Sequence, residues 1–499
     1  MITREKKLYY NTFSTLILQL VFLICGFILP KQTLLYYGSE VNGLVVSITR
    51  FLSIISLLEM GMGPIIQFNL YKPLLDKDNE TISKIIISAE RFYKKLATIF
   101  LIYIIILAYI YPKTNREFNF YFTSSMIIII SISIFAQYYF GLTYQAFLNA
   151  DQKVYINSIL QIFTIVLNLV VSIILMKLGY SIHIIKLISA IVFLFRPVFQ
   201  NIYVKRKYKL NLKIKFEGEP IKQKWNGFAQ HIAAVVTGEI DVILLTFFIG
   251  YQSVSIYSSY FLVINGITNF VLAIVAGLES YWGNIIANNE KKILVESFRK
   301  IEFLTHFFVT FLYTTTAILI APFILVYIKG IRDEDLYYLP LFGALATFAY
   351  AMRCLRVPYF SIISSAGHYK ETQNGAFISM IINIVISILL IFKYNLIGIV
   401  IGTFLAMFYH TIYFVLYLEK NILFYKVKKF LIYLLTDILI VIFTFYFSKY
   451  FSMKENSYIS WIIYATKISC ISLTCTCLVY ITFHHKYIKN LILKKEKLQ

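Results

Sequence analysis

The sequence predicts an all-α polytopic membrane protein with about fourteen transmembrane helices, arranged as two parallel six-helix lobes plus a C-terminal helix pair. The first observation is composition, because 59% of the 499 residues are hydrophobic and only 14% are charged. A soluble chain of this length would need more polar surface. The second is that the apolar residues form runs of about 18 to 25, which is enough to cross a bilayer. The third is that basic residues favour alternate loops.

The apolar runs set the expected spans. The first begins after Arg4, Lys6 and Lys7. Because it is too long for the apolar core of a cleavable signal peptide, we expect it to be a span. The spans are expected near 11–36, 43–68, 94–112, 121–141, 156–176, 183–203, 227–248, 255–280, 302–328, 337–362, 374–392, 395–418, 429–448 and 458–483.

The distribution of positive charge predicts the orientation. The formal net charge is +22, and most of the 47 Lys and Arg residues fall in loops on the side of the N-terminus. Short cytoplasmic loops retain positive charge, so both termini are expected in the cytoplasm of a bacterial cell, with the chain in its inner membrane. The basic stretches near 205–224 and 486–497 are interpreted as topology determinants that lie against anionic lipid headgroups, and not as a nucleic-acid site.

An internal repeat predicts the organisation into lobes. Asn168-Leu-Val-Val-Ser-Ile-Ile-Leu175 resembles Asn383-Ile-Val-Ile-Ser-Ile-Leu-Leu390, and Gly38 and Asn79-Glu80 match Gly250 and Asn289-Glu290. Because six spans is an even number, both lobes have the same orientation, which is typical of transporters that rock about a central cavity. The expected parts are an N-lobe (1–208), a basic linker (209–225), a C-lobe (226–420), and spans 13 and 14 with a basic tail (421–499).

Arginines within the spans are the strongest candidates for an anion site. Arg50 lies inside span 2, where it either meets an anion in the cavity or pairs with an acid. Arg353 and Arg356 are three residues apart on span 10, so they share a helix face and repel each other unless an anion or carboxylates neutralise them. The alternative is that they extend toward the cytoplasmic headgroups.

Acidic and histidine residues within the spans are candidates for ion coupling or for structural ion pairs. They include Glu59 in span 2 and His231, Glu239 and Asp241 in span 7. Glu239 and Asp241 are about 200° apart around a helix, so one could pair with a cavity arginine while the other binds a coupling ion. Further ionisable residues inside spans are Arg196, Glu279, His410, Asp437 and Lys467, of which Asp437 and Lys467 could pair with each other.

No motif indicates catalysis, a cofactor or a metal centre. The chain has no Walker A sequence and no large extracytoplasmic loop, and its five cysteines lie in apolar segments without nearby His or acidic residues. We therefore expect a protein that is not an enzyme.

Several motifs resemble those of Wzx-type lipid-linked oligosaccharide flippases in the multidrug/oligosaccharidyl-lipid/polysaccharide (MOP) exporter superfamily. Their order and spacing match over about residues 1–420. The motifs are Leu57-Leu-Glu-Met-Gly-Met-Gly-Pro64, Leu70-Tyr-Lys-Pro-Leu74, Asp78-Asn-Glu80, Ala150-Asp-Gln-Lys-Val-Tyr155, Gly227-Phe-Ala-Gln-His231, Glu239-Ile-Asp241, Phe248-Ile-Gly250 and Ser255-Ile-Tyr257.

The resemblance implies a function and its partners. Such a protein moves undecaprenyl-pyrophosphate-linked oligosaccharide units across the cytoplasmic membrane for O-antigen, capsule or exopolysaccharide synthesis, alongside glycosyltransferases and a polysaccharide polymerase. Related flippases use arginines in spans 1, 2 and 8. Here Arg50 matches the span-2 position, but span 1 lacks an arginine and span 8 has only Glu279, so Arg353 and Arg356 would complete the pyrophosphate site. The alternatives are a cation-coupled multidrug exporter of the same superfamily and a polysaccharide polymerase.

Overall fold

A computed structural model describes residues 4–59, 61–114, 117–208, 210–216, 218–221, 228–275, 277–423 and 426–496. Over these residues the chain is built from helices, and the predicted fold class is confirmed. Thirteen helical segments of the described chain are long and apolar enough to cross a membrane. The first, Lys6–Glu59, has 54 residues and contains Gly38 with φ 81° and ψ 175°, so it comprises two of the expected spans.

The chain divides into two compact units, Met1–Ser255 and Ile256–Gln499. This boundary falls one helix beyond the expected linker, and the division at 209–225 stays a prediction. Unit 1 contains α1 (Arg4–Ser53), η1 (Ile54–Glu59), α2 (Met62–Asp76), α3 (Asn79–Thr114), α4 (Phe120–Ala136), η2 (Gln137–Gly141), α5 (Leu142–Ala150), α6 (Val154–Lys177), α7 (Ile182–Lys207), α8 (Phe228–Phe248) and the start of α9 (Tyr251–Val275). Unit 2 contains the rest of α9, α10 (Leu278–Ala287), α11 (Lys291–Ile328), η3 (Glu334–Tyr337), α12 (Pro340–Leu355), α13 (Val357–Ser365), α14 (Tyr369–Tyr394), α15 (Leu396–Leu418), η4 (Glu419–Leu423), α16 (Val427–Ser448) and α17 (Tyr458–Glu496).

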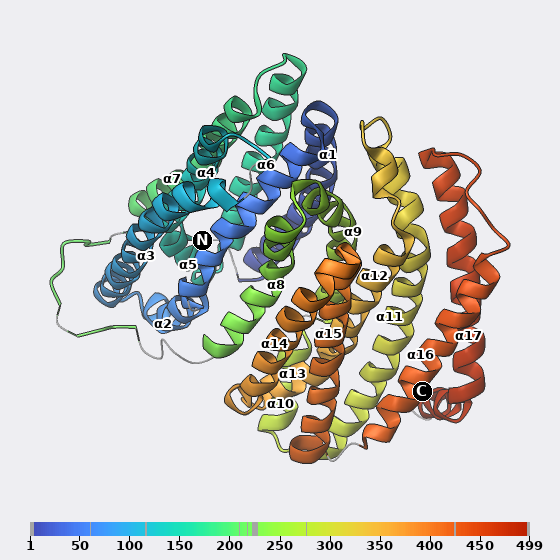
Figure 1. Ribbon diagram of the computed structural model, residues 1–499. Helices are drawn as coiled ribbons and strands as arrows, with labels where there is room; N and C mark the ends of the chain where they lie inside the picture. The colour runs from blue at the N-terminus through green and yellow to red at the C-terminus, as the bar shows by residue number, and fades with distance from the viewer. Residues whose placement is uncertain are drawn as a thin grey trace. The chain divides into compact units, whose positions relative to one another are not determined.

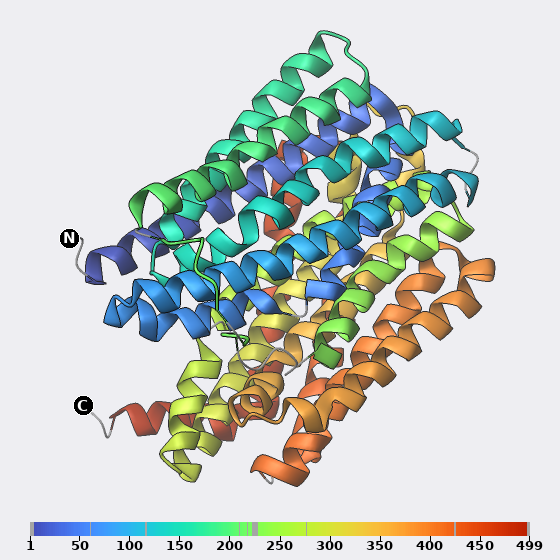
Figure 2. The same cartoon turned by 90° about the vertical axis from the view of Figure 1, so that its left-hand side faces the viewer.

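Within unit 1 the helices run alongside one another, with α6 packed against α1 and α7, and α3 against α4 (Figure 2). Its core includes Tyr93, Phe100 and Phe147, each at most 1% exposed. In unit 2, α15 packs against α12 and α14, while α16 and α17 pack together against α11 (Figure 1). The core of unit 2 includes Trp282 and Tyr359, both fully buried.

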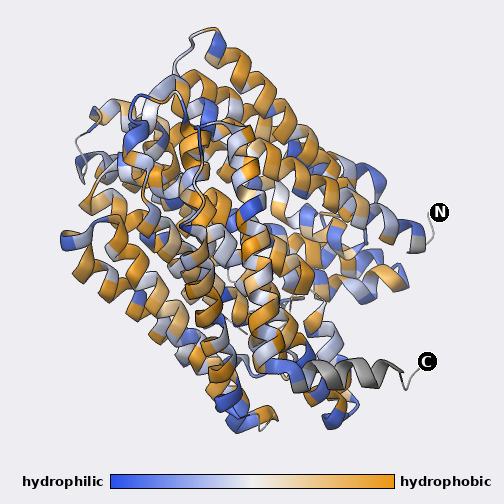
Figure 3. Ribbon diagram, turned by 90° about the vertical axis from the view of Figure 1, so that its right-hand side faces the viewer, coloured by the Kyte–Doolittle hydropathy of each residue, from blue (hydrophilic) through white to orange (hydrophobic). Residues whose placement is uncertain are grey.

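The surface of the helices is apolar, as a bilayer requires. Hydrophobic residues dominate the helix shafts, and hydrophilic residues gather toward helix ends and loops (Figure 3). Large aliphatic side chains such as Ile105 and Leu389 are about 70% exposed in the isolated chain. Such side chains are stable in that position only against lipid or another apolar surface.

Left-handed backbone positions support the internal repeat. All except Gly218 mark a place where one helix ends and another begins, because a residue with positive φ terminates the helical path. Eight of the eleven such residues in the described chain form four pairs that lie about 212 to 216 residues apart. The pairs are Gly38 and Gly250, Lys77 and Asn289, Gln152 and Gly367, and Gly179 and Asn395.

Two expected spans contain helix breaks that hydropathy did not reveal. Span 43–68 passes from α1 into the 3-10 segment η1, and left-handed Gly61 then begins the separate helix α2. Span 255–280 is likewise divided between α9 and α10. Apolar content continues across both breaks, which is why a hydropathy criterion merges the pieces. Met60 and Gly227 of the quoted motifs, and Lys209, Lys222 and Lys224 of the basic linker, lie outside the described residues.

Gly43 allows a close approach inside unit 1. A Cβ at Gly43 would lie 1.8 Å from the backbone oxygen of Tyr251, and neighbouring Asn42 donates to the Ser255 hydroxyl at 2.7 Å. We expect Gly43→Ala to lower the free energy of unfolding by at least about 1–3 kcal/mol, because backbone must move to relieve the overlap. Thermal unfolding of the detergent-solubilised protein measures this. Gly63→Ala is the control, since its Cβ would meet nothing within 4 Å, and equal melting temperatures for both variants would contradict the prediction.

Candidate functional site

The first charged cluster lies in unit 1, where α1 and η1 meet α8. The Nη1 atom of Arg50 lies 3.2 Å from Oε2 of Glu239, which joins α1 to α8. The Glu239 side chain is 16% exposed, whereas that of Arg50 is 40% exposed. Arg50 therefore has one carboxylate partner and an accessible part of its guanidinium that could bind a second anion.

The 3-10 conformation of η1 allows a second contact with α8, through His231. A 3-10 segment leaves main-chain carbonyls without the usual α-helical partner, and the Ser56 carbonyl lies 2.9 Å from His231 Nε2. Glu59, at the end of η1, accepts a long hydrogen bond from the Tyr93 hydroxyl at 3.5 Å and interacts electrostatically with His231. Unit 1 thus contains two polar contacts along α8, the Arg50–Glu239 ion pair and the contact of His231 with η1 near Glu59.

Asp241 is separated from Glu239 by its direction around α8. Its side chain is buried at 3% exposure, whereas Glu239 points to Arg50. This divergence follows from the angle of about 200° between residues two apart on a helix. Whether either acid couples transport to an ion stays a prediction.

The second cluster lies in unit 2 and is entirely basic. Arg353 lies in the last turn of α12, and Arg356 keeps helical dihedrals (φ −71°, ψ −23°) at the junction with α13, so the two remain about one turn apart. Their guanidinium carbons lie 5.7 Å from the Tyr350 ring centre and 5.8 Å from that of Phe414. Among the described residues, no carboxylate lies within 4.0 Å of either guanidinium.

His410 on α15 belongs to this basic cluster. Its ring centre lies 4.6 Å from that of Phe414, and it interacts electrostatically with Arg356. Its Nε2 atom is buried and has no hydrogen-bond partner within the described part of the chain. Arginines and an unsatisfied imidazole nitrogen at membrane depth are costly unless a ligand completes them. A phosphate is the type of ligand that arginine side chains bind, through their fork of N–H donors.

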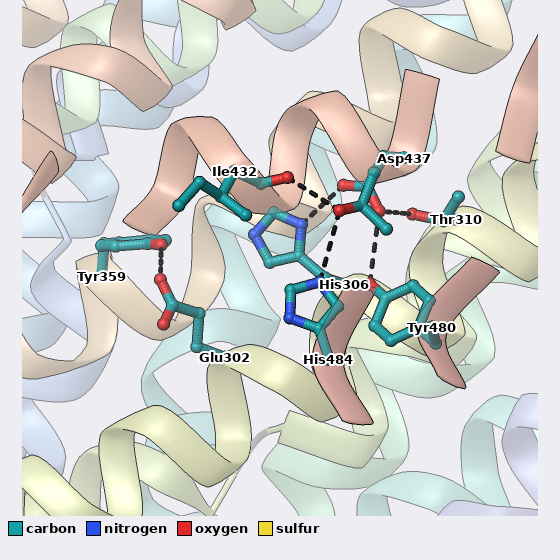
Figure 4. Close-up of polar contacts among 9 residues, drawn as sticks. Glu302, His306, Thr310, Tyr359, Ile432, Asp437, Tyr480 and His484 are labelled. Atoms are coloured by element: carbon teal, nitrogen blue, oxygen red, sulfur yellow. Dashed lines mark hydrogen bonds and ion pairs between the residues drawn. The ribbon is translucent and has the colours of Figure 1, made fainter. Parts of the chain in front are cut away.

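Asp437 does not pair with Lys467, so that expectation is wrong. Asp437 on α16 instead contacts His306 and Thr310 on α11 and Tyr480 on α17 (Figure 4). Lys467 lies over the ring of Phe451, 5.8 Å from its centre. The sequence interpretation overlooked His306 and Glu302. The available signal was their spacing, because Glu302, His306 and Thr310 recur every four residues and share one face of α11.

The Ala150–Tyr155 motif forms a polar junction at the ends of helices. Asp151 lies 2.7 Å from Lys153 Nζ and 3.6 Å from Lys7 Nζ, and it accepts a hydrogen bond from the Tyr208 hydroxyl. Burial, with this hydrogen bond, raises the pKa of Tyr208. The motif therefore joins the start of α1, the turn between α5 and α6 and the end of α7. This role is structural.

Metal binding has no obvious location in the described residues. Among them, no group of three or more His, Cys, Asp or Glu side chains is arranged to hold a metal ion.

Comparisons with known proteins identify the fold. No protein-family model matches the chain, and no curated protein matches it in sequence. Among solved structures, lipid II flippase MurJ in an inward closed conformation superposes with a TM-score of 0.71 and 15% identity, over 97% of this chain and 99% of that one. The chain therefore has the fold of lipid II flippase MurJ.

Multidrug exporters of the same superfamily are also similar in fold. An inward-facing MATE transporter of the MOP superfamily matches with a TM-score of 0.57 and 13% identity, over 80% of this chain and 93% of that one. A MOP superfamily transporter from Pyrococcus furiosus, described as having a binding pocket of reverse polarity, matches with a TM-score of 0.55 and 11% identity, over 82% and 92%. The fold is thus that of MOP superfamily transporters, and the protein is a multi-pass membrane protein.

The Arg50–Glu239 pair allows a charge-reversal experiment. Arg50→Glu or Glu239→Arg alone places two like charges together, so we expect each to reduce the yield of monodisperse protein severalfold. The double variant Arg50→Glu/Glu239→Arg restores opposite charges and should recover most of that yield. Size-exclusion chromatography of the purified protein measures this. The exposed Lys84–Glu80 pair is the control, because its reversal should change little. A double variant no better than the single ones would contradict a direct pair.

Proposed function

We propose that this protein is a flippase that translocates undecaprenyl-pyrophosphate-linked oligosaccharide units across the bacterial cytoplasmic membrane by alternating access. The observation that carries the proposal is the basic cluster of Arg353, Arg356 and His410, which lacks a nearby carboxylate among the described residues of a MOP-type fold. Such a cluster matches a polyanionic headgroup, because each guanidinium presents a fork of donors to phosphate oxygens.

Arg50 would supply a second contact to the pyrophosphate. Its guanidinium is held by Glu239 at one atom, and the Arg50 side chain as a whole is 40% exposed. A carboxylate partner orients an arginine without satisfying all five of its donors. During transport the pyrophosphate would bind the remaining N–H donors of Arg50 or replace Glu239 as its partner. Arg50 would therefore contact the pyrophosphate only transiently. In this scheme the stronger anion site is the basic cluster of Arg353, Arg356 and His410. Among the described residues, no carboxylate competes with the pyrophosphate for the arginines there.

The extent of the structural matches favours the flippase over the multidrug exporter. The lipid II flippase matches 97% of this chain, whereas the inward-facing multidrug transporter matches 80%. One observation supports the exporter, since Glu59, Glu239 and Asp241 give unit 1 acidic groups suited to a coupling cation. An organic cation, however, would be repelled by Arg353 and Arg356.

The proposed cellular context follows from this function. We infer that both termini face the cytoplasm and that the chain transports its cargo without covalent chemistry, so it is a transporter and not an enzyme. Glycosyltransferases would build the lipid-linked unit on the cytoplasmic side, and a polysaccharide polymerase would receive it on the other side. Surface polysaccharide would then be the product that depends on this protein.

Replacing the two arginines of the basic cluster tests the proposal. We expect Arg353→Gln/Arg356→Gln to reduce surface polysaccharide at least about tenfold in the native host. Each charge-assisted hydrogen bond contributes about 1.5–3 kcal/mol, and about 1.4 kcal/mol corresponds to a factor of ten. Lipid-linked precursor should accumulate at the same time. Quantification of extracted polysaccharide and of the lipid-linked intermediate measures both effects.

The control is Lys467→Gln, which removes a basic residue on α17 that contacts an aromatic ring and should leave export unchanged. Immunoblots must show equal amounts of the variants in the membrane. Normal polysaccharide in the double arginine variant would overturn the pyrophosphate assignment. Raised drug sensitivity with normal polysaccharide would favour the multidrug exporter.

A further inference from the structure

A buried acid–histidine pair lies in unit 2 where α11, α16 and α17 meet (Figure 4). Oδ2 of Asp437 lies 2.6 Å from Nδ1 of His306, and both side chains are buried. We propose that His306 and Asp437 form a proton-binding site within the membrane-embedded part of the protein. The site does not depend on the nature of the cargo, and its residues belong to unit 2, whereas Glu59, Glu239 and Asp241 belong to unit 1.

The hydrogen bonds around Asp437 indicate an ionised carboxylate. Its Oδ1 accepts from the Thr310 hydroxyl at 2.7 Å and from the Tyr480 hydroxyl at 3.3 Å. An ionised carboxylate only accepts hydrogen bonds, so His306 donates to Oδ2 through Nδ1–H. Three donors stabilise the charged form of Asp437. With a neutral His306, the pair carries one negative charge.

The second nitrogen of His306 is the position for the proton. Its Nε2 atom is buried and has no hydrogen-bond partner among the described residues. A proton taken up there forms one N–H bond and breaks none within the protein, and the imidazole becomes an imidazolium. The pair then has no net charge. At low dielectric, a neutral ion pair is favoured over an isolated buried anion.

The pair belongs to a polar ladder that reaches a helix break. The Tyr433 ring stacks between His306, at 5.0 Å, and His484, at 4.7 Å. His484 is non-helical (φ −119°, ψ 18°), so α17 breaks there, and its Nε2 lies 3.3 Å from the Thr436 hydroxyl. The ladder therefore extends from the buried pair to the point where the regular part of α17 ends.

A metal site or a purely structural ion pair would account for these contacts less well. A metal ion would need further ligands, and the described residues contain no cluster of three or more suitable side chains. A separation of 2.6 Å between Nδ1 and Oδ2 is that of a shared hydrogen. Attachment of α17 to α11 does not require charge, because Tyr464 and Ile468 already pack against Leu319. Buried ion pairs are often replaceable by apolar residues without loss of stability.

Further titratable and charged groups from each neighbouring helix face the site and contribute to its potential. Glu302 on α11 bonds the Tyr359 hydroxyl of α13, and it interacts electrostatically with groups on α16 and α17. The remaining groups are Arg299 on α11, Lys429 and Tyr433 on α16, and Tyr480, His484 and Tyr487 on α17.

Proton counting on the purified full-length protein tests the site. Wild type, His306→Asn, Asp437→Asn and the double variant are titrated in detergent over roughly pH 4.5 to 9. Asn at position 306 keeps an amide donor near Nδ1 but takes no proton, so the fold should persist. We expect wild type to bind one proton more than His306→Asn. In the Asp437→Asn background, His306 should bind its proton at a pH about one unit or more lower than in wild type, because the negatively charged neighbour is absent.

His368 provides the matched control, since its Nδ1 contacts the Tyr417 hydroxyl at 2.9 Å and no acid. The difference in proton uptake between wild type and His368→Asn gives the pH at which His368 binds its proton. That pH should be the same in the wild-type and Asp437→Asn backgrounds. If the His306 proton also titrates identically in both backgrounds, or if His306→Asn binds as many protons as wild type, the proposal is overturned.

Tyr480→Phe keeps the test decisive if a charged-residue variant fails to fold. It removes one hydroxyl and leaves His306 and Asp437 in place. The loss of a donor makes the ionised carboxylate less stable, so the pair should take up its proton at a higher pH than in wild type. Uptake at an unchanged or lower pH would contradict the assignment of Asp437 as an ionised member of the pair.

Discussion

Backbone hydrogen bonding in hydrocarbon constrains this chain more than any other interaction. Every main-chain group at membrane depth must find a protein partner, so the spans are helices and each break in a helix needs local compensation. The breaks are also where polar side chains gather. Ser56 in η1 offers its carbonyl to His231, and His484 marks the break in α17. Irregular backbone and costly side chains thus occupy the same places.

The internal repeat shows the same constraint at the level of the lobes. Left-handed residues recur at matching positions, and some are not glycine, as with Lys77 and Asn289. Side chains tolerate that conformation poorly, so the turn itself determines the position more than the residue type does. The paired turn positions recur along the chain, but the charged clusters of the two units differ. In unit 1 an arginine meets an acid, whereas in unit 2 two arginines and a histidine meet none among the described residues. This asymmetry is the reason that we propose the second cluster as the stronger anion site.

Sequence reasoning predicted the fold class because hydropathy is a property of single segments. The approximate number of spans needs no knowledge of which helices touch. Pairing is different, since Arg50 and Glu239 are 189 residues apart and no periodicity relates them. Asp437 illustrates the limit. Its sequence neighbours suggested Lys467 in the adjoining span, but the acid contacts α11, a helix of the preceding lobe, through His306 and Thr310. Helix breaks inside apolar runs could not be predicted from hydropathy, because the sequence stays apolar on both sides of Gly61.

The acid–histidine pair gives the C-terminal helices a role beyond packing. Apolar contacts already attach α17 to α11, so the buried charges on α11 and α16 add cost without being needed for adhesion. A site that changes from one negative charge to none upon proton uptake alters the electrostatic energy of the helix contacts around it. Because Asp437 receives donors from α11 and α17 together, a change in its charge acts on both contacts at once. A transporter can use such a site to link helix rearrangement to the proton gradient across its membrane.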